Sequence, residues 1–241
     1  MSFYDIFHRG IRVQKKIISD DNFTYRHIIN IKVLKPLILK QNLTILDYGC
    51  GVGTVDFYLA SKGSRIMGID ISRDAIKVCR ESAKKIGVSD RTKFEDINFK
   101  SLSTYDLIIC SEIIEHVPDD LILLRKLTKH LKIKGYLYVS TPSIKAPLYR
   151  LGIANDFDKM VGHLRRYELS TLIEKIETIG YKIVFVKKTE GILRNSFFVF
   201  PLLNWFVRFI KGPISDLVTL LDDILVKIFG ESNIIILAQK V

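Results

Sequence analysis

The sequence has 241 residues, of which 48% are hydrophobic, and 37 basic against 26 acidic side chains give it a formal net charge of +11. This length suits one sizeable domain with a full core, and the composition excludes a disordered or fibrous chain. The positive charge favours anionic partners such as nucleic acid, anionic lipid or a phosphorylated substrate, or it belongs to an ordinary solvated surface, because the lysines form no long run.

Cysteine content and the N-terminal residues predict the compartment. Cys50, Cys79 and Cys110 form no CxxC pair and are odd in number, so reduced thiols are predicted rather than a disulfide framework or a zinc site. Residues 1–16 mix acids with bases and contain no apolar core, so they predict no signal peptide. We therefore expect a cytoplasmic protein.

Hydrophobic periodicity predicts alternating strands and helices. Residues 23–40 have apolar positions at helical spacing, interrupted at Pro36, and form the core of an expected helical segment over 1–42. The predicted strands are 44–48, 65–70, a short one at 93–94, 105–110, 136–140, 181–187 and 233–239. The predicted helices are 54–61 closed by Gly63, 73–86 between Ser72 as cap and Gly87 as stop, 119–131, 170–180 with Ser170 as cap, and 217–229.

Repeated β-α units with short connections predict a doubly wound, Rossmann-like α/β fold. We expect one domain over 1–241, with a mostly parallel seven-stranded sheet, an antiparallel last strand and helices on both faces. Two connections, 142–167 and 191–230, are longer than usual, and long connections in compact domains tend to carry function.

The loop 47–53, DYGCGVG, joins the first predicted strand to the helix that follows. Ligands of open α/β sheets bind beyond the carboxyl ends of the strands, and Gly49, Gly51 and Gly53 permit a tight turn with close approach of a ligand. Asp70 ends the second predicted strand, where a carboxylate can accept both hydroxyls of a ribose. These features indicate an adenosine-containing cofactor, and a nicotinamide dinucleotide would also fit.

Three details favour an amino-acid-linked cofactor over a dinucleotide. The glycine spacing is GxGxG, with Thr54 where a dinucleotide motif has its third glycine. Asp47 would repel a pyrophosphate but suits an ammonium group, and Asp96 follows the third predicted strand, where it could accept from an adenine amino group. A glycine loop alone is weak evidence, so the prediction rests on the loop together with these acids.

With these motifs the sequence resembles the class I S-adenosylmethionine (SAM) dependent methyltransferases, in particular the ubiquinone-biosynthesis O-methyltransferase type and the small-molecule enzymes around it. The resemblance covers about 23–190 and the final strand. The matching segments are LDYGCGVGT (46–54), GIDIS (68–72), FEDI (94–97), DLIICSEIIEHVPD (106–119) and GHLRRY (162–167). It implies SAM as the cofactor and S-adenosylhomocysteine as its product.

The resemblance also implies which residues bind SAM. Those expected at the methionine part are Asp47, Gly49, Cys50 and Gly51, with Arg26 at its carboxylate; those at the ribose and adenine are Asp70, Ile71, Asp96 and Ile97; and Ser111 is expected near the sulfonium.

The segment Glu112-Ile-Ile-Glu115-His116 follows the fourth predicted strand. In a short helix before Pro118, spacings of three and four would put these side chains on one face. His116 is the natural general base, because the pKa of histidine lies near neutrality. A structural role for Glu112 and His116 in packing the loop remains an alternative.

Glu112, Glu115 and His116 could instead bind Mg²⁺ together with an acceptor hydroxyl. The pattern is similar to that of metal-dependent O-methyltransferases of the ubiquinone type and of small-RNA 2′-O-methyltransferases. In the RNA enzymes a later histidine joins the site, and His163 is its counterpart by this resemblance. His163 could otherwise face the acceptor, while Arg165 and Arg166 bind an anionic group of it or form a basic surface loop.

The insertion 191–230 is strongly apolar over 196–210 but shorter there than the roughly 20 residues that span a bilayer. The predicted amphipathic helix 217–229 exposes its polar positions. Those positions are Asp216, Asp222, Asp223 and Lys227. We expect a helical cap that lines an apolar acceptor pocket.

The alternatives for the insertion are peripheral membrane contact, a homodimer contact and simple packing on the sheet. Membrane contact would use interfacial side chains such as Trp205, Arg208 and Lys211. It would place the protein at the inner face of the membrane.

These features predict SAM-dependent O-methylation of a small-molecule, lipid-like, isoprenoid or glycan acceptor. The alternative is an RNA 2′-O-methyltransferase with a Glu/Glu/His metal site, which is less favoured because the sequence contains no recognisable RNA-binding module. A nicotinamide oxidoreductase and a non-catalytic SAM-binding scaffold are the remaining classes.

Overall fold

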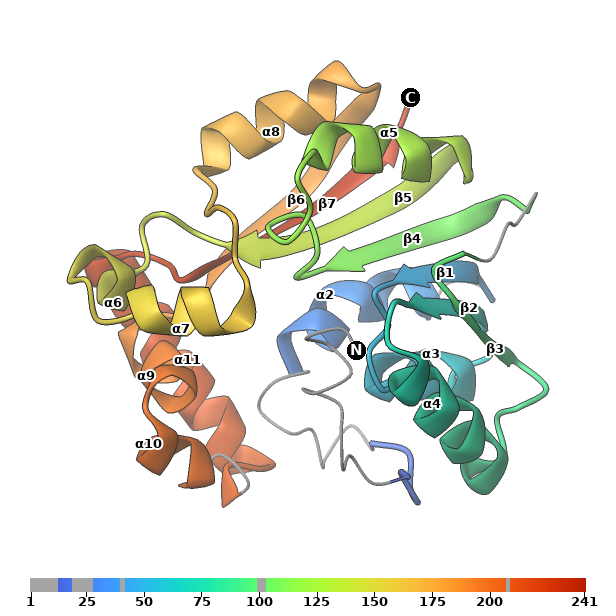
Figure 1. Ribbon diagram of the computed structural model, residues 1–241, viewed down its shortest axis with the longest axis horizontal. Helices are drawn as coiled ribbons and strands as arrows, with labels where there is room; N and C mark the ends of the chain where they lie inside the picture. The colour runs from blue at the N-terminus through green and yellow to red at the C-terminus, as the bar shows by residue number, and fades with distance from the viewer. Residues whose placement is uncertain (1–12, 19–27, 40–41, 99–102, 207–208) are drawn as a thin grey trace. The chain divides into compact units, whose positions relative to one another are not determined.

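The computed structural model describes residues 13–18, 28–39, 42–98, 103–206 and 209–241 (Figure 1). Hydrogen bonding orders its strands β3-β2-β1-β4-β5-β7-β6. The chain divides into two compact units, Met1–Ile109 and Cys110–Val241. The mostly parallel, seven-stranded α/β sheet is the one predicted, and the single domain over 1–241 stays a prediction.

The first unit is built from successive β-α repeats. Its elements are α2 (Ile28–Ile38), β1 (Thr44–Tyr48), α3 (Thr54–Ser61), β2 (Arg65–Asp70), α4 (Arg73–Ile86), β3 (Thr92–Asp96) and most of β4 (Tyr105–Ser111). β1 pairs in parallel with β2 and β4, and β2 pairs in parallel with β3. The carboxyl ends of these strands therefore lie at one edge of the sheet, where the glycine loop and Asp70 follow them.

Local sequence explains the ends of α4. The Ser72 hydroxyl accepts from the backbone N–H of Ala75 at 3.2 Å, and Gly87 ends the helix with φ 82°. Both confirm the predicted cap and stop. Ala75, Cys79 and Ala83 recur at intervals of four and are buried, so one face of α4 packs inward.

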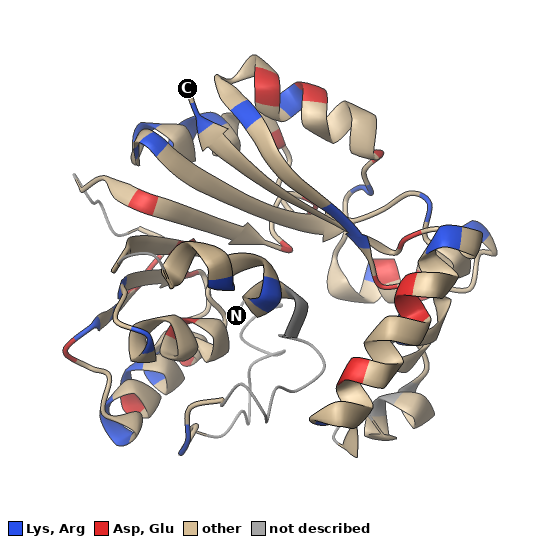
Figure 2. Ribbon diagram, turned by 180° about the vertical axis from the view of Figure 1, so that it is seen from behind, with Lys and Arg blue, Asp and Glu red and all other residues tan. Residues whose placement is uncertain are grey.

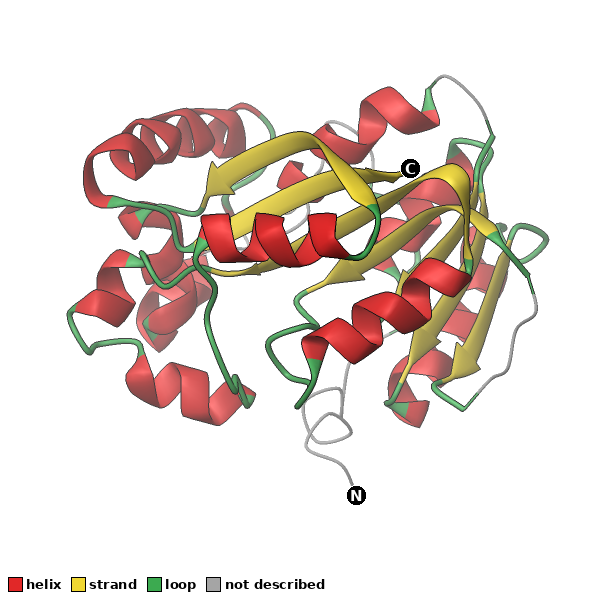
Figure 3. Cartoon of the chain, turned by 90° about the horizontal axis from the view of Figure 1, so that it is seen from above, coloured by secondary structure: helices red, strands yellow, loops and turns green. Residues whose placement is uncertain are grey.

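The second unit contains the antiparallel part of the sheet and the remaining helices (Figure 3). Its elements are α5 (Asp120–Lys129), β5 (Leu131–Pro142), α6 (Pro147–Arg150), α7 (Asn155–Val161), α8 (Leu169–Thr178), β6 (Tyr181–Thr189), α9 (Ile192–Val199), α10 (Pro201–Phe206), α11 (Pro213–Phe229) and β7 (Asn233–Lys240). β7 lies between β5 and β6 and is antiparallel to both. Its residues 233–238 are buried, because both faces of this central strand are covered.

The predicted N-cap of α8 was wrong. Its N-cap is Glu168, without a capping side-chain hydrogen bond, instead of Ser170. Tyr167 pairs with Ser143 in an isolated bridge, and its carbonyl accepts from the N–H of Ile144 at 2.9 Å. The extended chain therefore ends at 167, and the helix begins before the serine.

The predicted exposure of Asp222 was also wrong. α11 begins at Pro213, which suits the first position of a helix, and it buries Asp222 completely. The Asp222 carboxylate accepts from the backbone N–H groups of Gly191 at 2.7 Å and Arg194 at 3.0 Å. These groups belong to the first turn of α9, which lacks intrahelical partners, so Asp222 is a cap supplied by another helix.

Among the described residues, no helix is long and apolar enough to cross a bilayer. The insertion is instead folded into the short helices α9 and α10 and the longer α11.

Candidate functional site

The glycine loop of the first unit adopts the conformation that its sequence predicts. Gly49, Gly51 and Gly53 have φ angles of 88°, 53° and 73°. This left-handed region costs other L-residues about 1–2 kcal/mol. A Cβ on Gly53 would also lie 3.0 Å from Cζ of Phe57 and 3.1 Å from Sγ of Cys79. The loop therefore requires glycine for backbone conformation and for space.

Asp70 is fixed at the end of β2 by two backbone groups. Its Oδ2 accepts from Gly51 N–H at 2.8 Å, and its Oδ1 accepts from Ser72 N–H at 2.8 Å. Each carboxylate oxygen keeps a further lone pair for a ligand hydroxyl. Ile71 beside it is half exposed. These positions suit the ribose and adenine contacts expected of both residues, which stay predictions.

Two buried acids flank the glycines of the loop, Asp47 at its start and Asp56 in α3 directly after it. Burial raises the pKa of Asp47 to about 7, with a contribution from the charge of Asp70, while a side-chain interaction with Asp56 opposes it. Burial and then the charge of Asp47 raise the pKa of Asp56 well above its ordinary value. The pair therefore retains a proton near neutrality. Sequence analysis missed Asp56, whose one signal is an acid inside the apolar segment TVDFYLAS.

Gln14 ties a segment near the N-terminus to the loop. Its backbone N–H donates to Ser82 Oγ at 2.9 Å, and its Nε2 donates to the carbonyl of Val52 and to Thr54 Oγ1, each at 3.0 Å. Gln14 thus bridges the glycine loop and α4. It was missed because it belongs to no periodic segment and its partners are distant in sequence.

The remaining predicted SAM contacts are less constrained by the structure. Asp96 is half buried, accepts from Asn98 N–H at 2.8 Å and is followed by the half-buried Ile97. It lines a hollow of about 380 Å³ with side chains of α4, namely Arg73, Ile76, Lys77, Arg80 and Glu81. Arg26 lies outside the described residues. Cys50 is half buried, and a side-chain hydrogen bond with Cys79 and then burial raise the pKa of its thiol.

In the second unit, a turn replaces the short helix expected around Glu112. Glu112 has φ 56°, and its N–H donates to Ser140 O at 2.9 Å. Its Oε1 accepts from Ser140 Oγ and from Asn233 Nδ2, both at 2.7 Å. Ser111 Oγ lies 2.7 Å from Ser140 Oγ. Glu112 is thus bonded to the ends of β5 and β7, and Asn233 was missed because it is 121 positions away.

Glu115 is fully buried. Its Oε2 accepts from Thr141 Oγ1 at 2.9 Å, while its Oε1 accepts no hydrogen bond from any described residue. Burial and then the charge of Glu112 raise the pKa of Glu115 well above its ordinary value. A buried oxygen without a donor is costly, and it marks a place where a ligand or ion would be favoured.

Two imidazoles lie beside Glu115, with ring centroids 4.9 Å apart. Nδ1 of His116 lies 3.1 Å from the carbonyl of Gly162, and Nδ1 of His163 lies 2.9 Å from Oδ1 of Asp158. A carbonyl or carboxylate only accepts, so both rings carry a proton on Nδ1, and each Nε2 is an acceptor when neutral. Burial lowers the pKa of His116, which keeps it neutral and able to take a proton.

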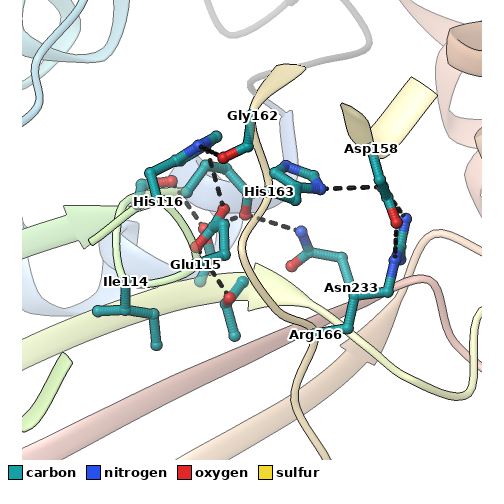
Figure 4. Close-up of polar contacts among 12 residues, drawn as sticks. Ile114, Glu115, His116, Asp158, Gly162, His163, Arg166 and Asn233 are labelled. Carbon is teal, nitrogen blue, oxygen red and sulfur yellow. Dashed lines mark hydrogen bonds and ion pairs between the residues drawn. The ribbon is translucent and has the colours of Figure 1, made fainter. Parts of the chain in front are cut away.

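Glu115, His116 and His163 each offer one ligand atom, and these atoms lie within 4.8 Å of one another (Figure 4). Converging acceptors fit either a divalent cation or the O–H group of an acceptor. One carboxylate with two imidazoles suits Mn²⁺, Fe²⁺ or Zn²⁺ better than the oxygen-preferring Mg²⁺. Glu112 is absent from this set, and its role as a metal ligand stays a prediction.

The segment GHLRRY fastens the loop that carries Glu115 and His116. Leu164 N–H donates to the carbonyl of Glu115 at 2.9 Å, and Arg165 Nη2 donates to the carbonyl of Pro118 at 2.7 Å. The Tyr167 hydroxyl lies 2.5 Å from Oδ2 of Asp120 and 3.1 Å from the carbonyl oxygen of Ile114, and its one proton is shared between these acceptors. This tyrosine was missed as a site residue, although it closes the loop that precedes α5.

The Arg166 side chain is bound by other side chains of the protein. Its Nε and Nη2 donate to the two carboxylate oxygens of Asp158 at 2.6 and 2.5 Å, and its guanidinium lies 4.5 Å from the ring centre of Tyr149. An open hollow of about 370 Å³ adjoins this pair. Its walls are Tyr149, Asn155, Asp158, Lys159, His163, Leu164, Arg165 and Arg166. Binding of an anionic acceptor group by these arginines stays a prediction.

Comparison with known proteins identifies similar sequences. A sequence model of a methyltransferase domain matches residues 39–184, more than half of the chain. The chain is 31% identical to the ubiquinone biosynthesis O-methyltransferase of Coxiella burnetii over 132 residues, which are 52% of this chain and 56% of that protein. It is 31% identical to the enzyme of the same description from Vibrio parahaemolyticus over 122 residues, 48% of this chain and 52% of that one. The chain thus spans about half the length of these curated relatives.

Similar solved structures confirm the fold. Magnesium protoporphyrin IX methyltransferase from Synechocystis PCC 6803, with bound S-adenosylhomocysteine, matches with a TM-score of 0.60 and 15% identity, covering 90% of this chain and 82% of that one. The N-methyltransferase NodS from Bradyrhizobium japonicum, in complex with S-adenosylhomocysteine, matches with a TM-score of 0.58 and 16% identity, covering 92% and 89%. Identities this low establish the α/β fold alone.

Proposed function

Because the chain belongs to the class I SAM-dependent methyltransferases, with SAM as cofactor, we propose that it transfers the methyl group of SAM to an oxygen of a small, lipid-like acceptor. The two curated sequence relatives reported above are described as O-methyltransferases, which supports oxygen as the accepting atom. An isoprenoid or glycan hydroxyl belongs to the same class of acceptor.

In this reaction the acceptor oxygen attacks the methyl carbon as the carbon–sulfur bond breaks, and S-adenosylhomocysteine leaves. The acceptor proton must pass to a base. The proposal is carried by the convergence of Glu115, His116 and His163, whose ligand atoms lie within 4.8 Å of one another, and by the buried Oε1 of Glu115, which accepts no hydrogen bond from any described residue. We assign His116 as the base, with His163 beside it orienting the acceptor hydroxyl. Glu112 holds the loop through Ser140 and Asn233.

A divalent metal at the same three side chains is the second candidate, because the buried Oε1 of Glu115 and the two imidazoles form a suitable donor set. When bound there, such an ion would lower the pKa of a coordinated acceptor hydroxyl. Glu115, His116 and His163 would then hold the ion.

The apolar surface of the insertion supports a lipid-like acceptor. α11 buries the polar side chains Ser215, Thr219 and Asp222 and turns its large apolar side chains outward, the reverse of a helix that covers a core. The exposed large apolar residues of the insertion are Phe200, Leu202, Trp205, Phe206, Phe209, Ile214, Leu217, Leu220, Leu221, Ile224, Ile228 and Phe229. A surface of this kind marks an interaction site.

We propose that these side chains rest on a bilayer that presents the acceptor. Trp205 is half exposed and Lys211 is exposed, which suits the interface, and the net charge of +11 suits anionic lipid. Arg208 lies outside the described residues. A peripheral position at the inner membrane face follows from this proposal. Binding to lipid vesicles distinguishes this position from the cap and the homodimer.

The comparisons lend no support to the RNA alternative, since the reported relatives of known description act in ubiquinone biosynthesis. In Figure 2 the lysine and arginine positions are spread over several helices and strands.

Calorimetry with SAM and S-adenosylhomocysteine tests the cofactor assignment, and absence of binding at millimolar ligand would contradict it.

Release of S-adenosylhomocysteine in the presence of vesicles containing an isoprenoid phenol tests the acceptor class. His116→Ala should abolish this release and spare SAM binding, while unchanged release would remove His116 as the base.

A further inference from the structure

One turn of the chain, 158–163, anchors both imidazoles of the candidate site. α7 ends at Val161, and Gly162 follows it as the C-cap, with a left-handed φ of 79°. The Gly162 carbonyl accepts a hydrogen bond from Nδ1 of His116 at 3.1 Å. The Asp158 carboxylate in α7 accepts one from Nδ1 of His163 at 2.9 Å. The backbone N–H of His163 also donates to the Asp158 carbonyl at 2.9 Å. Both histidines are therefore oriented from one short element of the connection 142–167.

Asp158 is itself rigidly held. Both of its carboxylate oxygens accept from Arg166, in the bidentate geometry that makes such pairs strong, and Arg166 stacks on Tyr149. Burial alone would raise the pKa of Asp158, but hydrogen bonds from His163 and Arg166 outweigh it and hold the pKa below its usual range. Because the Arg166 guanidinium donates to both of its oxygens, Asp158 is held as a carboxylate, which can only accept from His163.

We infer that Asp158 is a positioning residue for methyl transfer: it holds His163 in the Nδ1–H tautomer, so that Nε2 presents a lone pair to the site beside Glu115 and His116. This role rests on the proposed function. It holds for either candidate chemistry, because a carboxylate behind a histidine orients the ring equally for a hydroxyl or for a metal ion.

The obvious alternative is that Asp158 merely anchors Arg166. The two roles differ in what they predict for Asp158→Asn, which keeps the size of the side chain but offers one acceptor oxygen where the carboxylate offers two. His163 and Arg166 then compete for that oxygen. A positioning role requires the ring of His163 to lose its single tautomer, whereas an anchoring role leaves the ring unaffected.

Nitrogen NMR of the histidine rings, with the His163 signal assigned from a His163→Gln variant, tests this without any acceptor. In the wild type at a pH where the ring is neutral, His163 should be the Nδ1–H tautomer, and in Asp158→Asn a substantial Nε2–H population should appear. Asp158→Glu should partly restore the first tautomer. Asp156→Asn is the matched control, because the Asp156 side chain is fully exposed on the same helix. An unchanged tautomer in Asp158→Asn would overturn the inference.

The turnover number of the Asp158→Asn variant is a second test of the positioning role. Asp158→Asn should lower kcat by about 10²–10⁴-fold, the range of acid–base contributions, with SAM affinity unchanged. In a His163→Gln background the same change should have no further effect, because its role passes through His163. Equal losses in both backgrounds would show that Asp158 acts elsewhere. Failure of the wild type to bind SAM would instead contradict the proposed function. The NMR result does not depend on SAM binding.

Discussion

Oε1 of Glu115 lies 3.9 Å from Nε2 of His116, in a place where the carboxylate is fully buried. Nothing in the described part of the chain donates to this oxygen, although its neighbour Oε2 is bonded to Thr141. Without the carboxyl proton that the raised pKa of Glu115 favours, two acceptor atoms so close together in a buried setting repel each other until a donor or a cation lies between them. The environment of Glu115 Oε1 and His116 Nε2 therefore indicates most directly which kind of ligand the site binds.

Divalent metal binding should depend on Glu115 and not on Glu112. Glu115→Gln removes one of the three converging ligand atoms, so Mn²⁺ or Co²⁺ affinity measured by calorimetry should fall at least about tenfold. Glu112→Gln is the matched control, because the Glu112 carboxylate is bonded to Ser140 and Asn233. Equal affinity in the wild type and Glu115→Gln, or no metal binding by the wild type, would favour the metal-free base mechanism.

Asp56→Asn should stabilise the protein without ligand, increasingly so at higher pH. The pKa of Asp56 is raised in the folded state by burial and by Asp47, so the folded chain keeps a proton that the unfolded chain releases above about pH 4. Stability therefore falls as pH rises through this window, and asparagine lacks the effect. We expect a gain of about 1–3 kcal/mol at pH 8 and little at pH 4.5, measured by urea unfolding.

Asp74→Asn, which removes an exposed acid from the first turn of α4, controls for the loss of a charge. A stability difference between Asp56→Asn and the wild type that stays constant from pH 4.5 to pH 8 would show that Asp56 is already ionised in the folded protein.

The fold could be predicted because local signals agree with it. Apolar segments such as 105–110 are buried strands, Ser72 and Gly87 bound α4, and three glycines take the positive φ angles that their spacing suggests. Ser170 failed as a cap because pairing of Tyr167 with Ser143, which is remote in sequence, decides where α8 begins.

The site could be predicted only as far as its motifs reach. Glu115, His116 and His163 lie together in the structure without Glu112, and the partners of these side chains do not follow from spacing. Asn233 reaches Glu112 across 121 positions, and Asp158 belongs to a segment without a motif of its own. Long-range hydrogen bonds of this kind depend on how β5, β7 and the 142–167 connection pack, which periodicity does not encode.

Gln14→Ala should lower the affinity for SAM by loosening the glycine loop. The change removes donors to the Val52 carbonyl and Thr54 Oγ1, and each net hydrogen bond is worth about 0.5–1.5 kcal/mol. We expect SAM affinity to fall about fivefold to thirtyfold by calorimetry, because the loop loses its fixed geometry. Lys15→Ala, at the exposed next position, is the control. If both variants bind SAM like the wild type, Gln14 does not contribute to the cofactor site.

Trp205 gives a direct test of membrane contact, because it is the one tryptophan in the sequence and lies half exposed in α10. Vesicles containing anionic lipid should shift its emission to the blue and increase it, since the indole enters the interface. Leu217→Glu with Leu221→Glu, on the exposed face of α11, should lower vesicle affinity at least about tenfold while sparing SAM binding.

The alternatives to membrane contact give different results in the same experiment. A homodimer would show a concentration-dependent emission shift without lipid and a doubled mass in light scattering, and the double glutamate variant would abolish both. A cap over an apolar acceptor would give a shift with the soluble isoprenoid phenol and none with plain vesicles. Because apolar side chains turned outward on α11 cost free energy in water, one of these three partners should cover them when the protein acts, and an emission unchanged by all three would contradict the interaction surface itself.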